Sequence, residues 1–360
     1  MRPTLLLVFA AGGMLFADDP TSLNNLGGQL FAAGQYRAAE SPLARAVELW
    51  SGSGNEHSAD LEAALHNLAA VYLAEGRFAV AEPVYQRAIQ MRETRAGLHD
   101  LSLLSPLGGF ALLYLEWGKP ARSKEIVNRA ISIAELHQEE QTVEAARGFA
   151  SLGGILIGQK RYSDARLWLE RALTIREHLF GADNSAAADT LMQLALVYRG
   201  EHRNDEAEQT YRRALGIYQQ TQDAAKRAFA MRCLAEVLES RHDYSEADEL
   251  LEQATSILTK KASVDPVGLA RVHAGLADLR AAQKRYGEAA MLYRKALEML
   301  EPAFGPENPQ LLTILDAYAR ALRASKDYAA AAGVDMRTMK IRVSLTLRGQ
   351  VSGFGDALVQ

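Results

Sequence analysis

The sequence contains a single cysteine, Cys233, among its 360 residues. No disulfide can form within one chain, and paired-cysteine metal sites are excluded as well. No cysteine lies near the N-terminal apolar segment, which argues against lipid attachment there. Cys233 itself is interpreted as a small apolar filler on a helix, not as a reactive thiol.

Neither sign of charge is in large excess. The chain has 40 Lys and Arg against 44 Asp and Glu, for a formal net charge of -4. Because no Lys/Arg block is long enough to form a phosphate-binding stripe, we expect no nucleic-acid partner. With 48% hydrophobic and 23% charged residues, the composition is that of a globular protein, not of a disordered one.

Catalytic and metal-binding motifs are also lacking. The sequence has no His-Glu-x-x-His and no glycine-rich phosphate loop, and its eight histidines are scattered among the repeats. His57 and His99 share a place between successive repeats, where a turn residue is the expected role. We therefore expect no enzyme activity, no cofactor and no metal.

The N-terminus has the pattern of an export signal. Arg2 precedes the almost uncharged apolar run Leu5–Phe16, and Ala17 is followed by Asp18. This predicts a signal peptide over residues 1–17 and an exported protein, periplasmic or secreted. The run is shorter than the roughly 20 apolar residues of a spanning helix, so no membrane span is expected in the mature chain. An uncleaved N-terminal membrane anchor and a capping helix are the alternatives.

An internal repeat of 42 residues runs through the chain. One alanine recurs with spacings of 42, and once 40, at Ala46, Ala88, Ala130, Ala172, Ala214, Ala254 and Ala296. An aromatic residue or its substitute stands ten residues earlier, from Tyr36 to Tyr286, and the same spacing leads on to Tyr328. A large apolar residue followed by a small one precedes each of these, as in Leu68 with Ala69. Together these positions define eight repeats over about residues 22–345.

Each repeat has the pattern of two helices. In the second repeat, Leu65, Leu68, Ala69 and Tyr72 follow the i, i+3, i+4, i+7 spacing of one helix face. Gly76 then ends this helix, and the second helix starts near residue 78. One pair cannot bury its apolar face alone, so neighbouring pairs must stack. The sequence predicts an all-α fold of sixteen helices.

These residues resemble the tetratricopeptide repeat family. The three small sites of the family are matched by Ala69, Ala81 and Ala88, and the 42-residue period is similar to that of kinesin light chains. The phrases at 22–26, 64–68 and 171–177 and the linkers at 180–184 and 304–309 also resemble that type. The resemblance implies a right-handed superhelical solenoid over residues 18–347. The glycine-containing segment 348–360 is predicted to be a flexible tail.

Two repeats depart from the pattern. Pro106, Gly108 and Gly109 lie within the expected first helix of the third repeat. We expect this helix to be shortened or kinked near Ser105, with Pro106 as its first residue. In the eighth repeat, Asp335 and Thr338 replace a large apolar residue and an alanine, which predicts a more polar outer face at the end of the stack.

The family resemblance implies that the first helix of each pair lines a concave, peptide-binding groove. The residues at the lining positions change in character along the chain, from polar to apolar to charged: Asn25, His66, Asn67, Leu112, Leu115, Ile157, Arg232 and Arg271. Asparagines such as Asn25 and Asn67 can hydrogen-bond the backbone of an extended peptide. Alternatively, these asparagines face water or cap turns, and the charged residues pair with one another across adjacent helices.

The function that follows is a scaffold that binds a protein or peptide partner. A self-assembling structural solenoid, joined through its ends or edges, is one alternative. A regulatory adaptor subunit of a larger complex is another. The sequence specifies neither the partner nor the oligomeric state.

Overall fold

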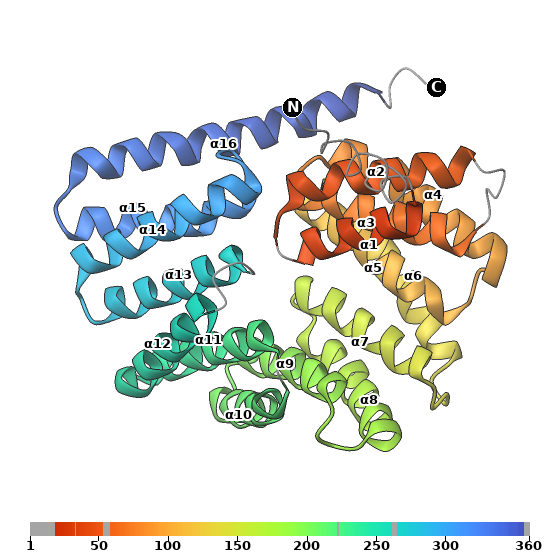
Figure 1. Ribbon diagram of the computed structural model, residues 1–360, viewed down its shortest axis with the longest axis horizontal. Coiled ribbons are helices and arrows are strands. Elements are labelled where there is room, and N and C mark those ends of the chain that lie inside the picture. Colours follow the sequence, from red (N-terminus) through yellow and green to blue (C-terminus); the bar gives the residue numbers. More distant parts are fainter. Residues whose placement is uncertain (1–18, 33, 53–57, 222, 261–264, 356–360) are drawn as a thin grey trace, which may run out of the picture. The chain divides into compact units, whose positions relative to one another are not determined.

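The computed structural model describes residues 19–32, 34–52, 58–221, 223–260 and 265–355, with side chains described up to Ser344 (Figure 1). Within these ranges the chain forms sixteen α-helices and two short 3-10 helices, and no strand. The predicted all-α fold of helix pairs is confirmed. The chain divides into two compact units, one ending at Leu98 and one beginning at His99, which are described separately.

The first unit contains two repeats. Its helices are α1 (Pro20–Ala32), α2 (Tyr36–Gly52), α3 (Ala59–Ala74) and α4 (Phe78–Ala96), each packed on the next. Leu43, Leu61 and Tyr85 are buried in its core. Gly27 shows why the repeat has a small residue here, because a Cβ at Gly27 would lie 2.4 Å from Cγ of Leu43. The small positions thus allow close approach of paired helices.

The second unit contains six repeats. Its helix pairs are α5 (Leu104–Glu116) with α6 (Pro120–Leu136), α7 (Val143–Gly158) with α8 (Tyr162–Phe180), α9 (Ser185–Gly200) with α10 (Asn204–Gln220), α11 (Ala224–Ser240) with α12 (Tyr244–Lys260), α13 (Pro266–Ala282) with α14 (Tyr286–Phe304), and α15 (Leu312–Ala324) with α16 (Tyr328–Gly355). Second helices pack against the first helix of the next repeat, and neighbouring first helices such as α5 and α7 also touch. We call the surface formed by the first helices the first-helix face.

One residue per repeat turns the chain between the two helices. It has a positive φ in all eight repeats: Gly34, Gly76, Gly118, Lys160, His202, His242, Lys284 and Lys326. Beside it a 6→1 hydrogen bond closes the helix end, as where Arg77 N–H donates to the Tyr72 carbonyl at 2.8 Å. This recurring turn confirms the helix-turn-helix register of the repeat.

The start of the third repeat differs from the prediction in detail. A 3-10 helix, η1 (Leu101–Leu103), leads into α5, and Pro106 is the third residue of α5 instead of the first. The N–H group that proline lacks costs the helix no hydrogen bond at this position, because the first N–H groups of a helix have no intrahelical acceptor. The first helix is shortened as predicted. The eighth repeat begins the same way, with η2 (Pro309–Leu311) before α15.

The polar outer face predicted for the eighth repeat is wrong in one respect. Thr338 is buried, and its hydroxyl donates to the Val334 carbonyl at 3.1 Å, so it takes the place of the usual alanine. The exposed side of α16 instead carries Met336 and Met339. The backbone of α16 continues to Gly355, past the predicted solenoid end at residue 347, and the flexibility of 348–360 stays a prediction. The predicted signal, residues 1–17, lies outside the described residues.

Candidate functional site

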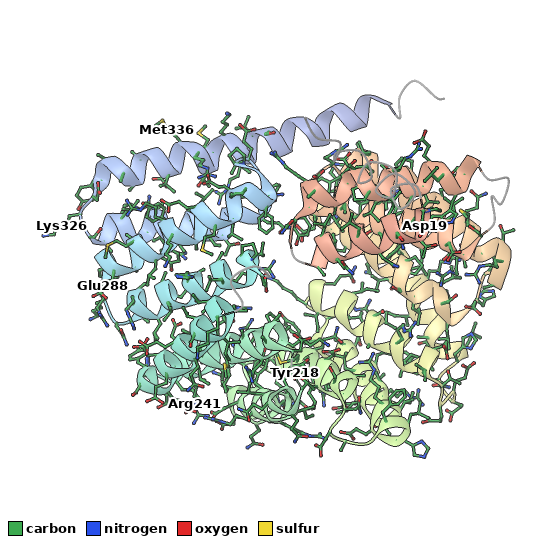
Figure 2. The ribbon with its side chains drawn as sticks, in the orientation of Figure 1. Asp19, Tyr218, Arg241, Glu288, Lys326 and Met336 are labelled. Atoms are coloured by element: carbon green, nitrogen blue, oxygen red, sulfur yellow. The ribbon has the colours of Figure 1, made fainter. Side chains whose placement is uncertain are left out.

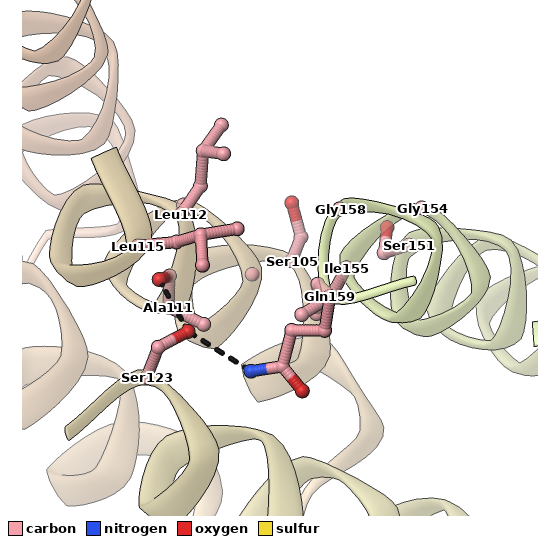
Figure 3. A pocket seen from close by; sticks show the side chains of 12 residues that line it. Ser105, Ala111, Leu112, Leu115, Ser123, Ser151, Gly154, Ile155, Gly158 and Gln159 are labelled. Atoms are coloured by element: carbon pink, nitrogen blue, oxygen red, sulfur yellow. Dashed lines mark hydrogen bonds between the residues drawn. The ribbon is translucent and has the colours of Figure 1, made fainter. Parts of the chain in front are cut away.

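An apolar pocket of about 240 Å³ lies on the first-helix face between α5 and α7 (Figure 3). Its α5 wall includes Leu112 and Leu115, and its α7 wall includes Gly154, Ile155 and Gly158. We call it the α5–α7 pocket. It is smaller than the ~300–1,000 Å³ clefts that hold drug-sized molecules. A single apolar side chain from a larger ligand suits this size better.

A short hydrogen-bond chain closes one edge of the pocket. The side-chain amide of Gln159 donates to Oγ of Ser123 at 3.0 Å, and this hydroxyl donates to the Ala111 carbonyl at 2.8 Å (Figure 3). Ser123 is buried and occupies a position where most repeats have alanine. The chain ties α6 and α7 to α5, so the pocket walls are fixed relative to one another.

The glycines of α7 fall into two groups. A Cβ at Gly153 would lie 2.5 Å from Leu169, and one at Gly148 would lie 2.8 Å from Leu104, so a larger residue at either position would displace the neighbouring leucine. A Cβ at Gly158 would instead meet Leu115 at an ordinary 3.6 Å. The packing around Gly158 therefore has room for a side chain, and the glycine leaves this space open in the pocket. Glycine nevertheless costs a helix about 1 kcal/mol relative to alanine.

A second hollow on the same face, of about 580 Å³, is lined by carboxylates. Glu236 and Glu239 of α11 and Asp278 of α13 face Tyr293 and Arg320 across it. The Tyr293 hydroxyl donates to Asp278 at 2.5 Å. Burial, with Asp278 and Glu236 nearby, raises the pKa of Glu239 to about 7. Near neutral pH, Glu239 therefore carries only part of a negative charge.

The predicted groove residues of the second unit lie in different places. Leu112 and Leu115 line the α5–α7 pocket, whereas Ile157 does not, and Ile155 lies there instead. Arg232 is paired with Glu236, which Arg199 also contacts from α9. The Arg232–Glu236 pair lies within α11, at i and i+4, whereas the Arg199–Glu236 pair joins two neighbouring helices, as in the alternative left open by the sequence. Arg271 is exposed on α13 and does not line the acidic hollow.

Sequence reasoning missed several lining residues. Ile155 shares a helix face with Ser151, Gly154 and Gly158, at spacings of three and four residues. This spacing could have identified it. No comparable signal marks Tyr293, because it comes from a second helix, α14, and reaches the first-helix face only through packing.

Of the three residues that the sequence predicts for the groove in the first unit, two contact other side chains and one is exposed. The Asn67 amide donates to Oδ1 of Asn24 at 3.0 Å, while Asn25 is exposed on α1. The His66 ring packs edge-on against Tyr85, with centroids 5.7 Å apart. Burial, together with the nearby Arg92, lowers the pKa of His66, so the ring is neutral near pH 7.

Three features of the residues that the structure describes bear on other chemistry. No cluster of His, Cys, Asp and Glu in that part of the chain is arranged to hold a metal ion. None of the helices described combines the length and the apolar run that a bilayer crossing requires. Cys233 is buried, and burial raises the pKa of its thiol to about 11, so it is not a thiolate near neutral pH.

Comparison with known proteins places the chain among repeat proteins. The family model for the tetratricopeptide repeat matches residues 18–94, 60–135, 144–220, 187–260 and 268–342. No curated protein sequence gives a significant match.

Among solved structures, a Rap protein complexed with Competence and Sporulation Factor is 14% identical, with a TM-score of 0.55 over 92% of this chain and 99% of that one. The apo form of RapI is 17% identical, with a TM-score of 0.52 over 79% and 98%. Kinesin-light-chain-type repeats from Podosopora anserina are 18% identical, with a TM-score of 0.47 over 56% and 96%. At these identities, the two Rap structures show a shared fold.

Proposed function

We propose, from the premise that the chain belongs to the tetratricopeptide repeat family, that it is an exported scaffold that binds a protein or peptide partner on its first-helix face. The α5–α7 pocket would receive an apolar side chain of that partner. The observation that carries the proposal is the pocket itself, in which the side chain of Leu112 remains 42% exposed beside unfilled space. This surface supports a binding role.

Leu112 and Leu115 leave apolar surface in contact with water at the pocket. Removing apolar surface from water contributes roughly 25 cal/mol per Å², so filling the pocket with a ligand side chain is favourable. The neighbouring Gly154 and Gly158 add no side chain that would fill it. Apolar patches left open on a protein surface often mark binding sites.

The structural neighbours support a ligand-carrying role without specifying the ligand. The Rap protein whose fold this chain shares is described in complex with Competence and Sporulation Factor. A stack of this fold can therefore hold a partner. Export is a separate part of the proposal and rests on the apolar run Leu5–Phe16 followed by Ala17.

The test is a charge placed at the pocket mouth. The partner is first captured from an extract of the producing cells on immobilised protein and identified by mass spectrometry. Its affinity for wild type and for Leu112→Asp is then measured by titration calorimetry. We expect Leu112→Asp to weaken binding at least tenfold, or about 1.4 kcal/mol, because the carboxylate must be desolvated when the pocket fills.

A matched control separates the pocket from general surface effects. Leu136→Asp introduces the same charge at an exposed leucine of α6 that does not line the pocket. It should bind like wild type, and both variants should keep the wild-type melting temperature. Wild-type affinity of Leu112→Asp would show that the partner binds elsewhere.

A further inference from the structure

Within the part of the chain that the structure describes, no repeat follows α16 and covers it. Its exposed side carries three large apolar side chains: Met336, 69% exposed, Met339, 67%, and Val343, 45%. Their i, i+3, i+7 spacing places them along one side of the helix. Figure 2 shows Met336 on the side of α16 away from α15. We call these three residues the α16 stripe.

Two positions of the stripe are polar in the inner repeats. The residues equivalent to Met336 in the second to seventh repeats are all polar or charged: Gln86, Asn128, Glu170, Arg212, Glu252 and Arg294. Those equivalent to Val343 in all seven earlier repeats are polar or charged as well: Ser51, Glu93, Glu135, Glu177, Gln219, Thr259 and Glu301. The terminal helix is therefore more apolar at these two positions than the inner helices.

Met339 occupies a position that several inner repeats bury. Its equivalents Ile89, Leu215 and Leu297 are buried, whereas Met339 is exposed. A terminal repeat of a solenoid normally needs a polar outer face to stay soluble. An apolar stripe at this place therefore indicates a surface that is covered in the functional protein, and flexible methionines are frequent at such surfaces.

We infer that two copies of this chain associate through antiparallel packing of their α16 stripes about a twofold axis. On one edge of the stripe the charges are self-complementary in this arrangement, and on the other edge Lys340 pairs with Glu307 of its own chain at 2.5 Å. Asp335 lies at its N-terminal end and Arg342 near its C-terminal end, and both are at least half exposed. With Met339 near the axis, Asp335 of one copy lies beside Arg342 of the second copy. Twofold pairing of one surface with itself closes after two chains.

The present partners of these charges do not prevent the pairing. Asp335 contacts Arg323 at 2.6 Å and Arg342 contacts Asp316 at 2.8 Å, and all four side chains are at least 40% exposed. Exposed pairs of this kind are weak. Each can accept an additional partner when the stripe is covered. The inference concerns α16 alone and does not depend on what the α5–α7 pocket binds.

The test uses the full-length purified chain and sedimentation velocity over a hundredfold range of concentration. We expect a monomer–dimer equilibrium that stops at two chains. Met339→Asp should raise the dimer dissociation constant at least tenfold. The control Met291→Asp alters a methionine of α14 that is 58% exposed but lies outside the stripe, and it should dimerise like wild type. Circular dichroism checks that both variants keep their helices.

Charge reversal tests the antiparallel arrangement. Asp335→Arg and Arg342→Asp should each weaken the dimer, and the double variant should recover it, because the two charges again face opposite partners. The inference is overturned by a monomer at every concentration, by growth beyond two chains, by unchanged dimerisation of Met339→Asp, or by a double variant no better than the single ones. Growth beyond two chains would instead indicate end-to-end association through α1, where Leu26 is exposed.

Discussion

At the scale of single residues, two glycines of α7 have different roles. Gly153 permits close packing on Leu169, whereas Gly158 borders the α5–α7 pocket. Replacing Gly158 by alanine should stabilise the protein by about 1 kcal/mol, because alanine favours the helix and its Cβ meets only Leu115. Gly153→Ala should destabilise it by about 1–3 kcal/mol through overpacking. Urea midpoints of the two variants measure the difference, and equal midpoints would contradict it.

The protonation of Glu239 gives a second residue-scale prediction. The pKa of Glu239 is raised from 4.5 to about 7, first by burial and then by Asp278 and Glu236. Between these pH values the folded protein keeps a proton that the unfolded chain has released, so this group lowers stability as pH rises through the window. Glu239→Gln should therefore melt higher than wild type at pH 8 and nearly equally at pH 4.5.

The control for this prediction is Glu249→Gln, which changes an exposed glutamate of α12. Its difference from wild type should not vary between the two pH values. A Glu239→Gln variant whose advantage is the same at pH 4.5 and pH 8 would show that Glu239 titrates normally.

The site could be predicted from the sequence only in part. Leu112 and Leu115 follow from their place in the repeat, because an apolar residue at a groove position faces the hollow. The sequence points to Ile157 and misses Ile155, because a shift of two residues turns a side chain by roughly 200° at 3.6 residues per turn. The ion pair of Arg232 with Glu236 has the i, i+4 spacing of one helix face, so the sequence could have predicted it.

At the scale of the helix pair, the residue at the turn between the two helices is the position where a substitution can most increase stability. Three repeats place glycine at the positive-φ position, and the other five place lysine or histidine there. An L-residue in this conformation is strained by roughly 1 kcal/mol, and glycine is not. Lys284→Gly should therefore stabilise the protein by up to about 1 kcal/mol, and Gly76→Ala should destabilise it by a similar amount.

Urea denaturation monitored by circular dichroism measures both changes. The matched control is Lys295→Gly, which changes an exposed lysine in the interior of α14. It should lower the midpoint, because glycine costs a helix interior about 1 kcal/mol relative to alanine. If Lys284→Gly also lowers the midpoint, the positive φ at this turn carries no strain for lysine.

The helices themselves are largely predictable. Their periodic apolar positions and the 42-residue spacing carry the register through all eight repeats, including the one spacing of 40. The sequence places the entry into α5 two residues late, because Leu101–Leu103 forms a 3-10 turn before the helix, and a proline fits equally well at the first or the third position. Burial of Thr338 depends on its bond to the Val334 carbonyl, which the residue type alone does not reveal.

At the scale of the whole molecule, export makes a prediction about the mature chain. If residues 1–17 are removed as a signal peptide, the exported protein begins at Asp18. N-terminal sequencing of protein recovered outside the cytoplasm should give Asp-Asp-Pro as its first three residues. A protein that is found only in the cytoplasm and begins at Met1 would contradict export.

The central claim is that a partner contacts the α5–α7 pocket, and site-specific photocrosslinking tests it most directly. A photoreactive phenylalanine analogue replaces Leu112 in one variant and Leu136 in another, and each is irradiated with the captured partner. The account predicts a covalent adduct from position 112 and none from position 136. Equal crosslinking from both positions, or crosslinking from position 136 alone, would contradict it.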